Sequence, residues 1–288
     1  MRRFAVIDVG SNSVRLMLVA DGKVLSKRLN TTRLGEGLAQ SPYLNAQAIQ
    51  RTVEAIASFS QQAKTDGAED ILVFATAATR SAKNKEVFLE EVKASCGLAI
   101  DVIAGEEEAE IGLLGALGNQ DGAIIDIGGA STEIVVKKSG EIIYKKSVDI
   151  GVVRLKDACG RDKTALIERC LSEVEKFGQV PTSQPFYGIG GTATTLAAQY
   201  LGLKEYQSDK ITGAALPADG VQALADRFAV MTTEEITALP CMPKGREDVI
   251  LGGAVLLSTL LKALGVGQIT VSDRDNLEGY AIKRGLME

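Results

Sequence analysis

Two short segments of the chain each place an aspartate at the end of an apolar run, directly before a turn of small residues. The first, IDVGSNSV, spans residues 7–14 and contains Asp8, and the second, IDIGGAST, spans residues 125–132 and contains Asp126. A turn of glycine and serine has no bulky side chain to keep an anion away, so its backbone N–H groups can point at phosphate oxygens. The aspartate beside it can hold a hydrated divalent cation. The sequence therefore predicts two phosphate-binding turns.

The two segments align without a gap over residues 7–18 and 125–136. Four positions carry the same residue in both: Ile7/Ile125, Asp8/Asp126, Gly10/Gly128 and Ser13/Ser131. Each segment leads to a hairpin-type turn pair, at 21–22 and 139–140, and then to another strand-like run. Two ordinary hairpins with glycine turns would account for each segment alone. The match in acid, turn and flanking strands instead favours an internal duplication whose ligand lies between the halves.

Histidine is absent from all 288 residues, which restricts the available chemistry. This absence excludes a histidine general base, a serine–histidine triad and a histidine metal site. Catalysis must therefore come from carboxylates, hydroxyls, lysine, arginine or a bound metal. The four cysteines form no C-x-x-C pair, and we expect reduced thiols in a cytoplasmic protein.

The composition, with 45% hydrophobic and 24% charged residues, is that of a globular protein. Its net charge of −5 argues against nucleic acid as a partner, since that partner selects for a basic face. The longest apolar run, residues 249–261, is too short to span a bilayer, so we predict a buried core helix there and no membrane partner.

Hydrophobic periodicity predicts the elements that position the two turns. The predicted strands cover residues 4–7, 14–19, 23–27, 71–75, 100–103, a meander over 123–147, 185–189 and 268–272. The predicted helices include one capped by Asn45 and ended by Gly67, and others over 85–95, 105–117, 164–177 and 277–287. We expect an N-terminal domain over residues 1–119 and a C-terminal domain over 120–276, with the final helix, 277–288, packing back on the first domain.

Two helix starts add candidate functional groups. The strand ending at Ile189 runs into Gly190-Gly191-Thr192 at the head of a helix, where exposed N–H groups suit a third phosphate contact. The helix over 105–117 opens with three acids, of which Glu108 is the last. Acidic residues are also common in the first turn of any helix, because they interact favourably with its dipole. From the residues alone, Glu108 can be either a functional acid or an ordinary helix-start acid.

Six motifs in order resemble the exopolyphosphatase and guanosine pentaphosphate phosphohydrolase family. They are IDVGSNS at 7–13, RLGEGL at 33–38, ATAATR at 75–80, EEEA at 106–109, DIGGASTE at 126–133 and GIGGT at 188–192. Weaker similarity at 246–250 and 272–273 extends the resemblance to nearly the whole chain. It implies an α/β fold of two duplicated ribonuclease-H-like domains, of the actin-like ATPase superfamily, with a central inter-domain cleft. The chain looks like the short, two-domain form.

The resemblance also implies roles for individual residues. Glu108 matches the general base that activates water, and Glu133 matches a second functional carboxylate. Asp8, Asp126 and Glu133 would hold Mg²⁺. The implied phosphate ligands are Ser11, Asn12, Ser13, Arg80, Gly128, Gly129, Ser131, Thr132, Gly191 and Thr192. Arg80 could instead be a solvated arginine at a helix end, and Arg15, which stands where Glu133 stands in the other half, is a further candidate phosphate contact.

The chain departs from the family pattern in two places. The second turn has Ala130 where the family has a third glycine, and a methyl group there either crowds a phosphate or is harmless if φ is negative. Near the end, family members read Ser-Asp, any residue, Gly-Leu-Arg-Glu-Gly, whereas residues 272–279 read SDRDNLEG. The arginine is lost from its usual place and acids come close to the cleft.

We therefore expect a Mg²⁺-dependent hydrolase that releases terminal phosphate from inorganic polyphosphate. The closest alternative is a guanosine pentaphosphate 5′-phosphohydrolase, which would use the same residues. An ATP-dependent kinase or chaperone-like ATPase of the same fold, and a non-catalytic sensor of polyphosphate or guanosine tetraphosphate, are further hypotheses. A homodimer is implied only by the resemblance.

Overall fold

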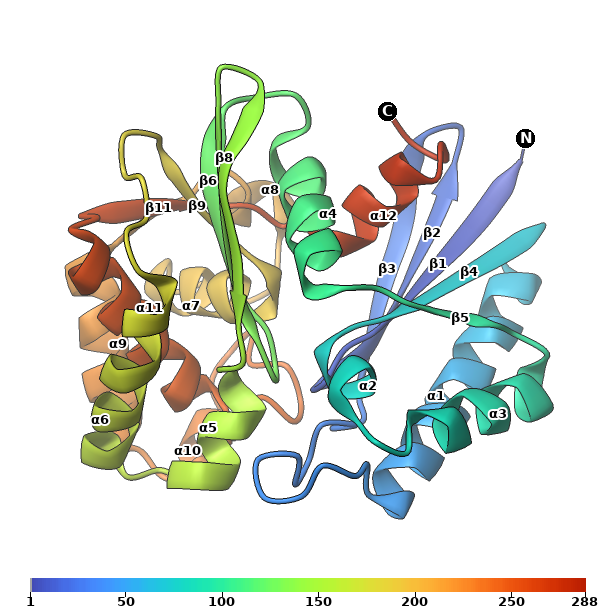
Figure 1. Ribbon diagram of the computed structural model, residues 1–288, viewed down its shortest axis with the longest axis horizontal. Helices are drawn as coiled ribbons and strands as arrows, with labels where there is room; N and C mark the ends of the chain where they lie inside the picture. The colour runs from blue at the N-terminus through green and yellow to red at the C-terminus, as the bar shows by residue number, and fades with distance from the viewer. Residues whose placement is uncertain (1) are drawn as a thin grey trace.

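The N-terminal meander forms one side of a five-stranded sheet in the computed structural model, which describes residues 2–288 (Figure 1). The sheet order is β3-β2-β1-β4-β5. Its strands are β1 (Arg3–Val9), β2 (Ser13–Ala20), β3 (Lys23–Thr31), β4 (Asp70–Ala75) and β5 (Ile100–Val102). The first three strands pair antiparallel, whereas β4 and β5 run parallel to β1. β1 is apolar on both faces, as expected of a strand covered on both sides.

The second half repeats this topology in a sheet of order β10-β11-β9-β6-β7-β8. Its strands are β6 (Gly122–Ile127), β7 (Thr132–Lys138), β8 (Glu141–Val148), β9 (Phe186–Ile189), β10 (Ala215–Pro217) and β11 (Gln268–Val271). The series β8-β7-β6-β9-β11 has the strand directions of β3-β2-β1-β4-β5, and β10 is added antiparallel at the edge. The predicted duplication is therefore confirmed by the order and directions of the strands.

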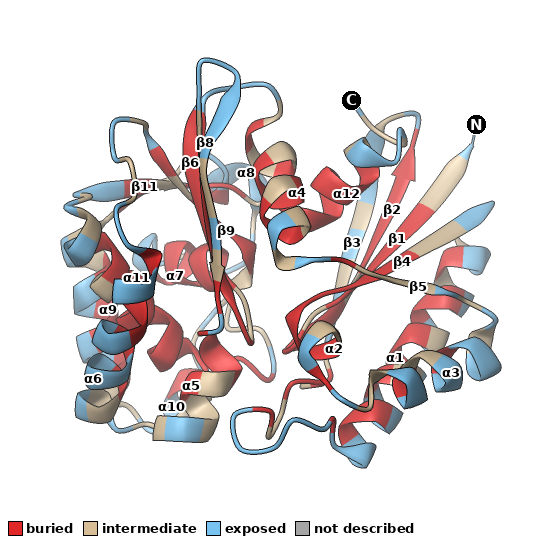
Figure 2. Ribbon diagram, in the orientation of Figure 1, coloured by how far each residue is buried: buried red, intermediate tan, exposed pale blue. Residues whose placement is uncertain are grey.

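Helices cover the sheets, with buried residues on the sides that face the sheets and exposed residues on the outer sides (Figure 2). The first half has α1 (Ala46–Thr65), α2 (Ala77–Ser81) and α3 (Lys85–Cys96). The second has α5 (Val152–Cys159), α6 (Lys163–Val174), the 3-10 helix η1 (Glu175–Phe177), α7 (Gly190–Tyr200), α8 (Ser208–Ile211), α9 (Ala218–Val230), α10 (Thr233–Thr237) and α11 (Ile250–Leu264). The long apolar run forms α11, whose residues Ile250–Leu257 are all buried, as predicted. Within residues 2–288, no helix has the length and hydropathy needed to cross a membrane.

Two helices, α4 (Gly105–Leu117) and α12 (Asn276–Lys283), lie side by side between the sheets (Figure 1). α4 packs Leu113 and Leu117 into a cluster with Ile124 of the second sheet. α12 packs Leu277 and Tyr280 into a cluster with β1 and β2, and the Tyr280 ring stacks on Phe74 of β4 with centroids 4.5 Å apart. The predicted domain boundary near residue 119 stays a prediction. The helix α4 lies before that boundary in the sequence and also contacts strands of the second sheet.

Glycines allow these two helices to touch. A Cβ atom built on Gly115 would collide with the Asp275 carbonyl, and one built on Gly279 would collide with the Ile111 carbonyl. Side chains at these positions would push the helices apart. The contact fixes the first residues of α12 beside the cleft between the halves.

Candidate active site

The two predicted phosphate-binding turns line one cleft of about 360 Å³ between the halves and touch each other there. They share the same internal hydrogen bond, because Gly10 N donates to Ser13 O and Gly128 N donates to Ser131 O, both at 3.0 Å. A Cβ atom on Gly129 would lie 2.7 Å from Ser11 Cβ, so glycine is needed where the turns meet. The segments are thus equivalent in structure as well as in sequence.

The RLGEGL segment supports the first turn from behind. Its Arg33 N donates to Asn12 O at 2.9 Å and its Gly35 N donates to Ser11 O at 2.8 Å. These bonds orient the backbone of the turn, and the Asn12 side-chain oxygen and nitrogen are buried without a hydrogen-bond partner among the described residues. A buried amide with free donors and acceptors is what a bound polar ligand would satisfy.

Most of the predicted site residues line the cleft, and four do not. Those that line it are Asp8, Ser11, Asn12, Ser13, Glu108, Asp126, Gly128, Gly129, Ser131 and Gly191. The four that are not part of its lining are Arg80, Thr132, Glu133 and Thr192. The Thr132 hydroxyl donates to Ile150 O at 2.6 Å and the Thr192 hydroxyl donates to Ile127 O at 2.9 Å, so neither hydroxyl is free for a phosphate.

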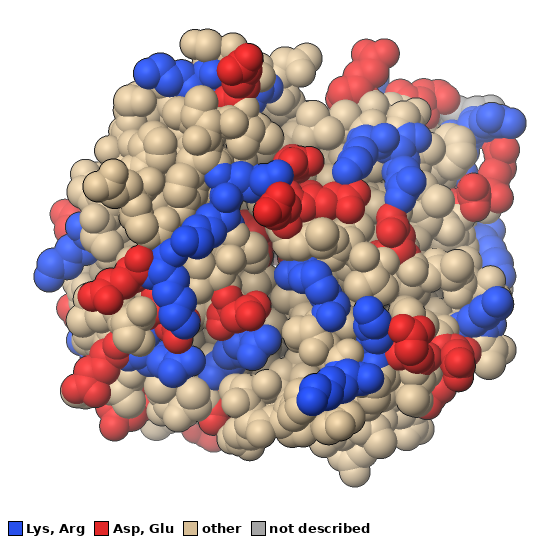
Figure 3. Space-filling view, viewed as in Figure 1, with Lys and Arg blue, Asp and Glu red and all other residues tan. Residues whose placement is uncertain are grey.

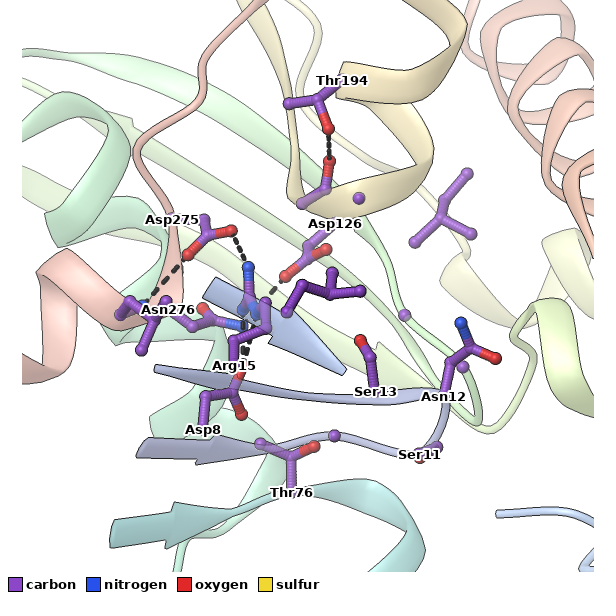
Figure 4. Close-up of a pocket in the computed structure, with 18 of the residues that line it drawn as sticks. Asp8, Ser11, Asn12, Ser13, Arg15, Thr76, Asp126, Thr194, Asp275 and Asn276 are labelled. Atoms are coloured by element: carbon purple, nitrogen blue, oxygen red, sulfur yellow. Dashed lines mark hydrogen bonds and ion pairs between the residues drawn. The ribbon is translucent and has the colours of Figure 1, made fainter. Parts of the chain in front are cut away.

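Asp8 is held by Arg15, which lies opposite it in the β1–β2 ladder. Arg15 Nε and Nη2 donate to Asp8 Oδ2 at 2.9 and 2.5 Å, and Nη1 donates to Asp275 (Figure 4). Burial alone would lower the pKa of Arg15, but the charges of Asp275 and Asp8 raise it well above its usual value. With carboxylates on both sides, Arg15 has no free edge for a phosphate in this structure.

In the second half the equivalent position, opposite Asp126 in the β6–β7 ladder, is Glu133. Glu133 is 1% exposed, and the Ser147 hydroxyl donates to its Oε1 at 2.6 Å. Burial raises the pKa of Glu133 well above its usual value, and the charges of Glu108 and Asp126 raise it further. The duplicated halves thus differ in charge at one equivalent position, arginine in the first and glutamate in the second.

Glu108 lines the cleft from the first turn of α4 and is paired with Arg80 of α2. Arg80 Nη1 donates to Glu108 Oε2 at 2.8 Å and to Ile103 O at 3.0 Å. Burial raises the pKa of Glu108, although the positive charge of Arg80 opposes that shift. A buried carboxylate with a raised pKa is suited to accept a proton from water.

Asp126 lies in the cleft among other acids. Burial, together with the carboxylates of Asp275, Glu108 and Asp8, raises the pKa of Asp126 to about 7. One oxygen of Asp8, Oδ1, is buried and has no hydrogen-bond partner among residues 2–288. This crowding of acids fits a divalent cation, whose charge would relieve their mutual repulsion.

The residues present fit Mg²⁺ through Asp8 and Asp126. No group of three or more acidic or cysteine side chains within residues 2–288 is arranged to hold a metal. Mg²⁺ does not require one, because it is usually bound by one or two carboxylates together with substrate phosphates and water. Glu133, the third predicted ligand, is buried and is not part of the cleft lining.

Arg246 is a cleft residue that the predicted set omits. Its side chain packs over Gly191, where a Cβ atom would collide with the guanidinium, and the residue is 7% exposed. In the described part of the chain it has no side-chain hydrogen bond or ion pair, and burial, with the charge of Arg15, lowers its pKa to about 10. A buried cation without a partner, facing a cleft, is suited to an anionic ligand. The only signal in the sequence was the weak family similarity at 246–250.

A family model described as the Ppx/GppA phosphatase family matches residues 3–285. The chain belongs to this family. Exopolyphosphatase 2 of Mycobacterium tuberculosis is 31% identical over 98% of both chains. A guanosine-5′-triphosphate,3′-diphosphate pyrophosphatase of Vibrio campbellii is 28% identical over 99% of this chain and 58% of its own length.

Solved structures of Ppx/GppA proteins superpose on the whole chain. An exopolyphosphatase-like protein gives a TM-score of 0.90 at 27% identity over 98% of both chains. The Aquifex aeolicus family member gives 0.79 at 29% identity, covering 99% of this chain and 98% of that one. A nucleoside triphosphate hydrolase of Neospora caninum, 11% identical with a TM-score of 0.53 over 99% of this chain, shares the fold. The expected family and fold class are thereby confirmed.

The Ppx/GppA family implies a phosphoanhydride phosphatase, and the first departure from its pattern does not strain this site. Ala130 is not among the non-glycine residues with positive φ in the described chain, so its methyl group costs no left-handed backbone strain. Ala130 lines the cleft, and Arg154 Nε donates to its carbonyl at 2.9 Å. The second turn is therefore formed without a third glycine.

Proposed function

We propose that the protein is a Mg²⁺-dependent exopolyphosphatase that releases terminal orthophosphate from inorganic polyphosphate. The observation that carries the proposal is the pairing of two phosphate-compatible turns across one cleft with Glu108 on its wall. The 31% identity to exopolyphosphatase 2 over both whole chains supports it.

The chain's own residues supply binding, orientation and proton transfer. Backbone N–H groups of residues 11–13 and 129–131 in the two turns, with Arg246, bind the terminal phosphoryl group. Glu108, oriented by Arg80, accepts a proton from the attacking water. Mg²⁺, held by Asp8 and Asp126, would neutralise charge on phosphate oxygens. Positioning and electrostatic stabilisation carry most of the barrier reduction in phosphoryl transfer, so a single carboxylate base is sufficient.

Guanosine pentaphosphate is a second candidate substrate, and the apolar and aromatic residues that line part of the cleft favour it. Leu29, Tyr206 and Pro243 line the cleft, and Leu29 and Tyr206 are 42% and 46% exposed. A phosphate chain makes no use of an apolar or aromatic wall, whereas a nucleoside can pack against one. The relative from Vibrio campbellii is named for this nucleotide.

One face of the molecule carries both basic and acidic groups. Lysine and arginine side chains form a row over the second half on the face seen in Figure 3, next to a group of acidic side chains. A row of this kind could guide a polyanion, but the neighbouring acids weaken its field. A cytoplasmic location and a homodimer, testable by fractionation and by light scattering, complete the proposal.

The test is phosphate release from long-chain polyphosphate, guanosine pentaphosphate and ATP in parallel, with Mg²⁺ and with chelator. We expect polyphosphate to give the highest kcat/KM and chelator to abolish release. Faster turnover of guanosine pentaphosphate would replace the first proposal by the second. Tight binding without hydrolysis of any of the three would indicate a sensor, and preference for ATP an ATPase.

A further inference from the structure

The residue that caps α12 and the first residue of that helix reach the acids of both phosphate-binding turns, one through Arg15 and one directly. Asp275 accepts a hydrogen bond from Arg15, which binds Asp8 of the first half. Asn276 Nδ2 donates to Asp126 Oδ2 of the second half at 3.0 Å (Figure 4). Asp275 and Asn276 are 4% and 5% exposed. A single dipeptide therefore links the two equivalent acids across the cleft.

The Asp275 carboxylate is fixed by the helix that it caps. Its Oδ1 accepts from Leu277 N at 3.1 Å, and its own N–H donates to Glu278 Oε2 at 3.1 Å, which completes a capping box. Lys27 Nζ lies 2.6 Å from Glu278 Oε1 and ties this start of α12 to β3. Both oxygens of Asp275 thus have assigned partners, so the direction of its contact with Arg15 is set by the helix.

The Asn276 amide orients the Asp126 carboxylate in a similar way. Its Nδ2 binds Oδ2, which leaves Asp126 Oδ1 on the side of Gly190, where a Cβ atom would collide with it. The other Asn276 atom, Oδ1, is buried with no partner among the described residues and lies against Gly112 of α4. The Asn276 side chain thus leaves one buried oxygen unsatisfied while its nitrogen donates to Asp126. This arrangement indicates that the contact with the acid sets the position of the Asn276 side chain.

The helix contact described above holds both residues in place, because Gly115 packs directly on the Asp275 backbone. Asp275 and Asn276 stand where the family pattern has glycine and leucine, so neither contact follows from that pattern.

We propose that Asp275 and Asn276 are positioning residues of the reaction: Asn276 orients the Asp126 carboxylate, and Asp275 holds Arg15 against Asp8. The inference rests on the proposed function of the cleft. Partners that orient the ligands of a metal site typically change metal affinity or activity by about 10- to 100-fold when they are removed. Removing the Asn276 amide frees Asp126 to rotate, and removing the Asp275 charge frees Arg15 from one of its two carboxylates.

The test compares Asn276→Ala and Asp275→Asn with a matched control, Asp162→Asn. Asparagine caps a helix about as well as aspartate does, so both Asp→Asn changes keep the cap and remove one charge. Asp162 caps α6 by accepting from Thr164 N and Ala165 N, at a helix that does not line the cleft. The measurements are kcat and KM for phosphate release, thermal unfolding, and Mn²⁺ affinity by electron paramagnetic resonance.

For Asn276→Ala we expect kcat and Mn²⁺ affinity each to fall by about 10-fold or more, with a smaller change in KM. For Asp275→Asn we expect a fall in kcat without the loss of helix stability that a missing cap would cause. The control should keep wild-type kcat and Mn²⁺ affinity. Wild-type kcat and Mn²⁺ affinity in both cleft variants would overturn the inference. Losses of kcat and Mn²⁺ affinity that are fully explained by a lower unfolding temperature would overturn it too.

Failure of the proposed function is distinguishable from failure of this inference. If the wild-type protein hydrolyses none of the substrates, the function fails, but Mn²⁺ titration of wild type and Asn276→Ala still tests the positioning of Asp126. A weaker affinity in the variant supports the inference, and equal affinities, or a wild type that binds no Mn²⁺, overturn it.

Discussion

Arg80 binds Glu108 through its Nη1 atom, at 2.8 Å from Oε2, and is not itself part of the cleft lining. Its positive charge opposes the rise in the Glu108 pKa that burial causes. Arg80→Ala should therefore raise the Glu108 pKa further. Since the base must be deprotonated, we expect the rate to fall at a higher pH than in wild type as the solution is acidified.

The measurement for Arg80 is the pH dependence of kcat. Arg51→Ala is a suitable control, because Arg51 forms a half-exposed ion pair with Glu36 and is not in the cleft. If kcat of Arg80→Ala falls at the same acidic pH as kcat of wild type, the charge of this arginine does not influence the pKa of Glu108.

Glu108→Gln should abolish proton transfer and leave the cleft in place. We expect a loss in kcat of about 10²- to 10⁴-fold, the usual contribution of a general base. Glu107, whose side chain pairs with Lys283 at 2.6 Å, offers a control in the same helical turn. Phosphate binding measured by calorimetry should persist in Glu108→Gln, and a wild-type kcat in this variant would remove Glu108 from the mechanism.

Arg246→Met should weaken substrate binding and stabilise the fold. The guanidinium is buried without a partner in the described chain, so an apolar side chain of similar length removes an uncompensated charge. We expect the free energy of unfolding to rise by about 0.5–2 kcal/mol, because replacing a functional group that is unfavourable for folding commonly stabilises a protein by this amount. Denaturant unfolding and KM measure the two effects, and a destabilised variant with wild-type KM would show that Arg246 is structural.

Gly279→Ala should destabilise the protein, because the added methyl group would meet the Ile111 backbone across the α4–α12 contact. Overpacking of this kind costs about 1–3 kcal/mol, and backbone atoms cannot move aside as side chains do. Gly267→Ala is the matched control, since a Cβ atom there has nothing within 4 Å. Equal midpoints of denaturation for the two variants would mean that the helices can separate without cost.

Local signals predicted the parts of the structure that depend on nearby residues. The hairpins, both turns and the Asn45 cap of α1, where Asn45 Oδ1 accepts from Gln47 N at 2.8 Å, follow from short patterns. α2 was missed because ATRS reads as a polar loop, and η1 because the predicted helix over 164–177 continues past the end of α6.

Contacts distant in sequence could not be predicted from such patterns. Asn276 and Asp126 are 150 residues apart, and their hydrogen bond depends on the packing of α12 against α4. Arg246 precedes an apolar helix and nothing in its neighbours shows that its charge stays unpaired. Whether the predicted site residues perform their assigned roles stays a prediction, although the structure brings most of them to one cleft.

The exchange of glutamate for arginine between the halves has a geometric consequence. A chain of identical phosphates is the same from either end, so it cannot by itself determine which way it enters. The two ends of the site differ in their supporting residues, since Asp8 pairs with the Arg15 guanidinium and Asp126 lies opposite the buried Glu133. A phosphate chain in this cleft would therefore have its direction set by the protein rather than by its own ends.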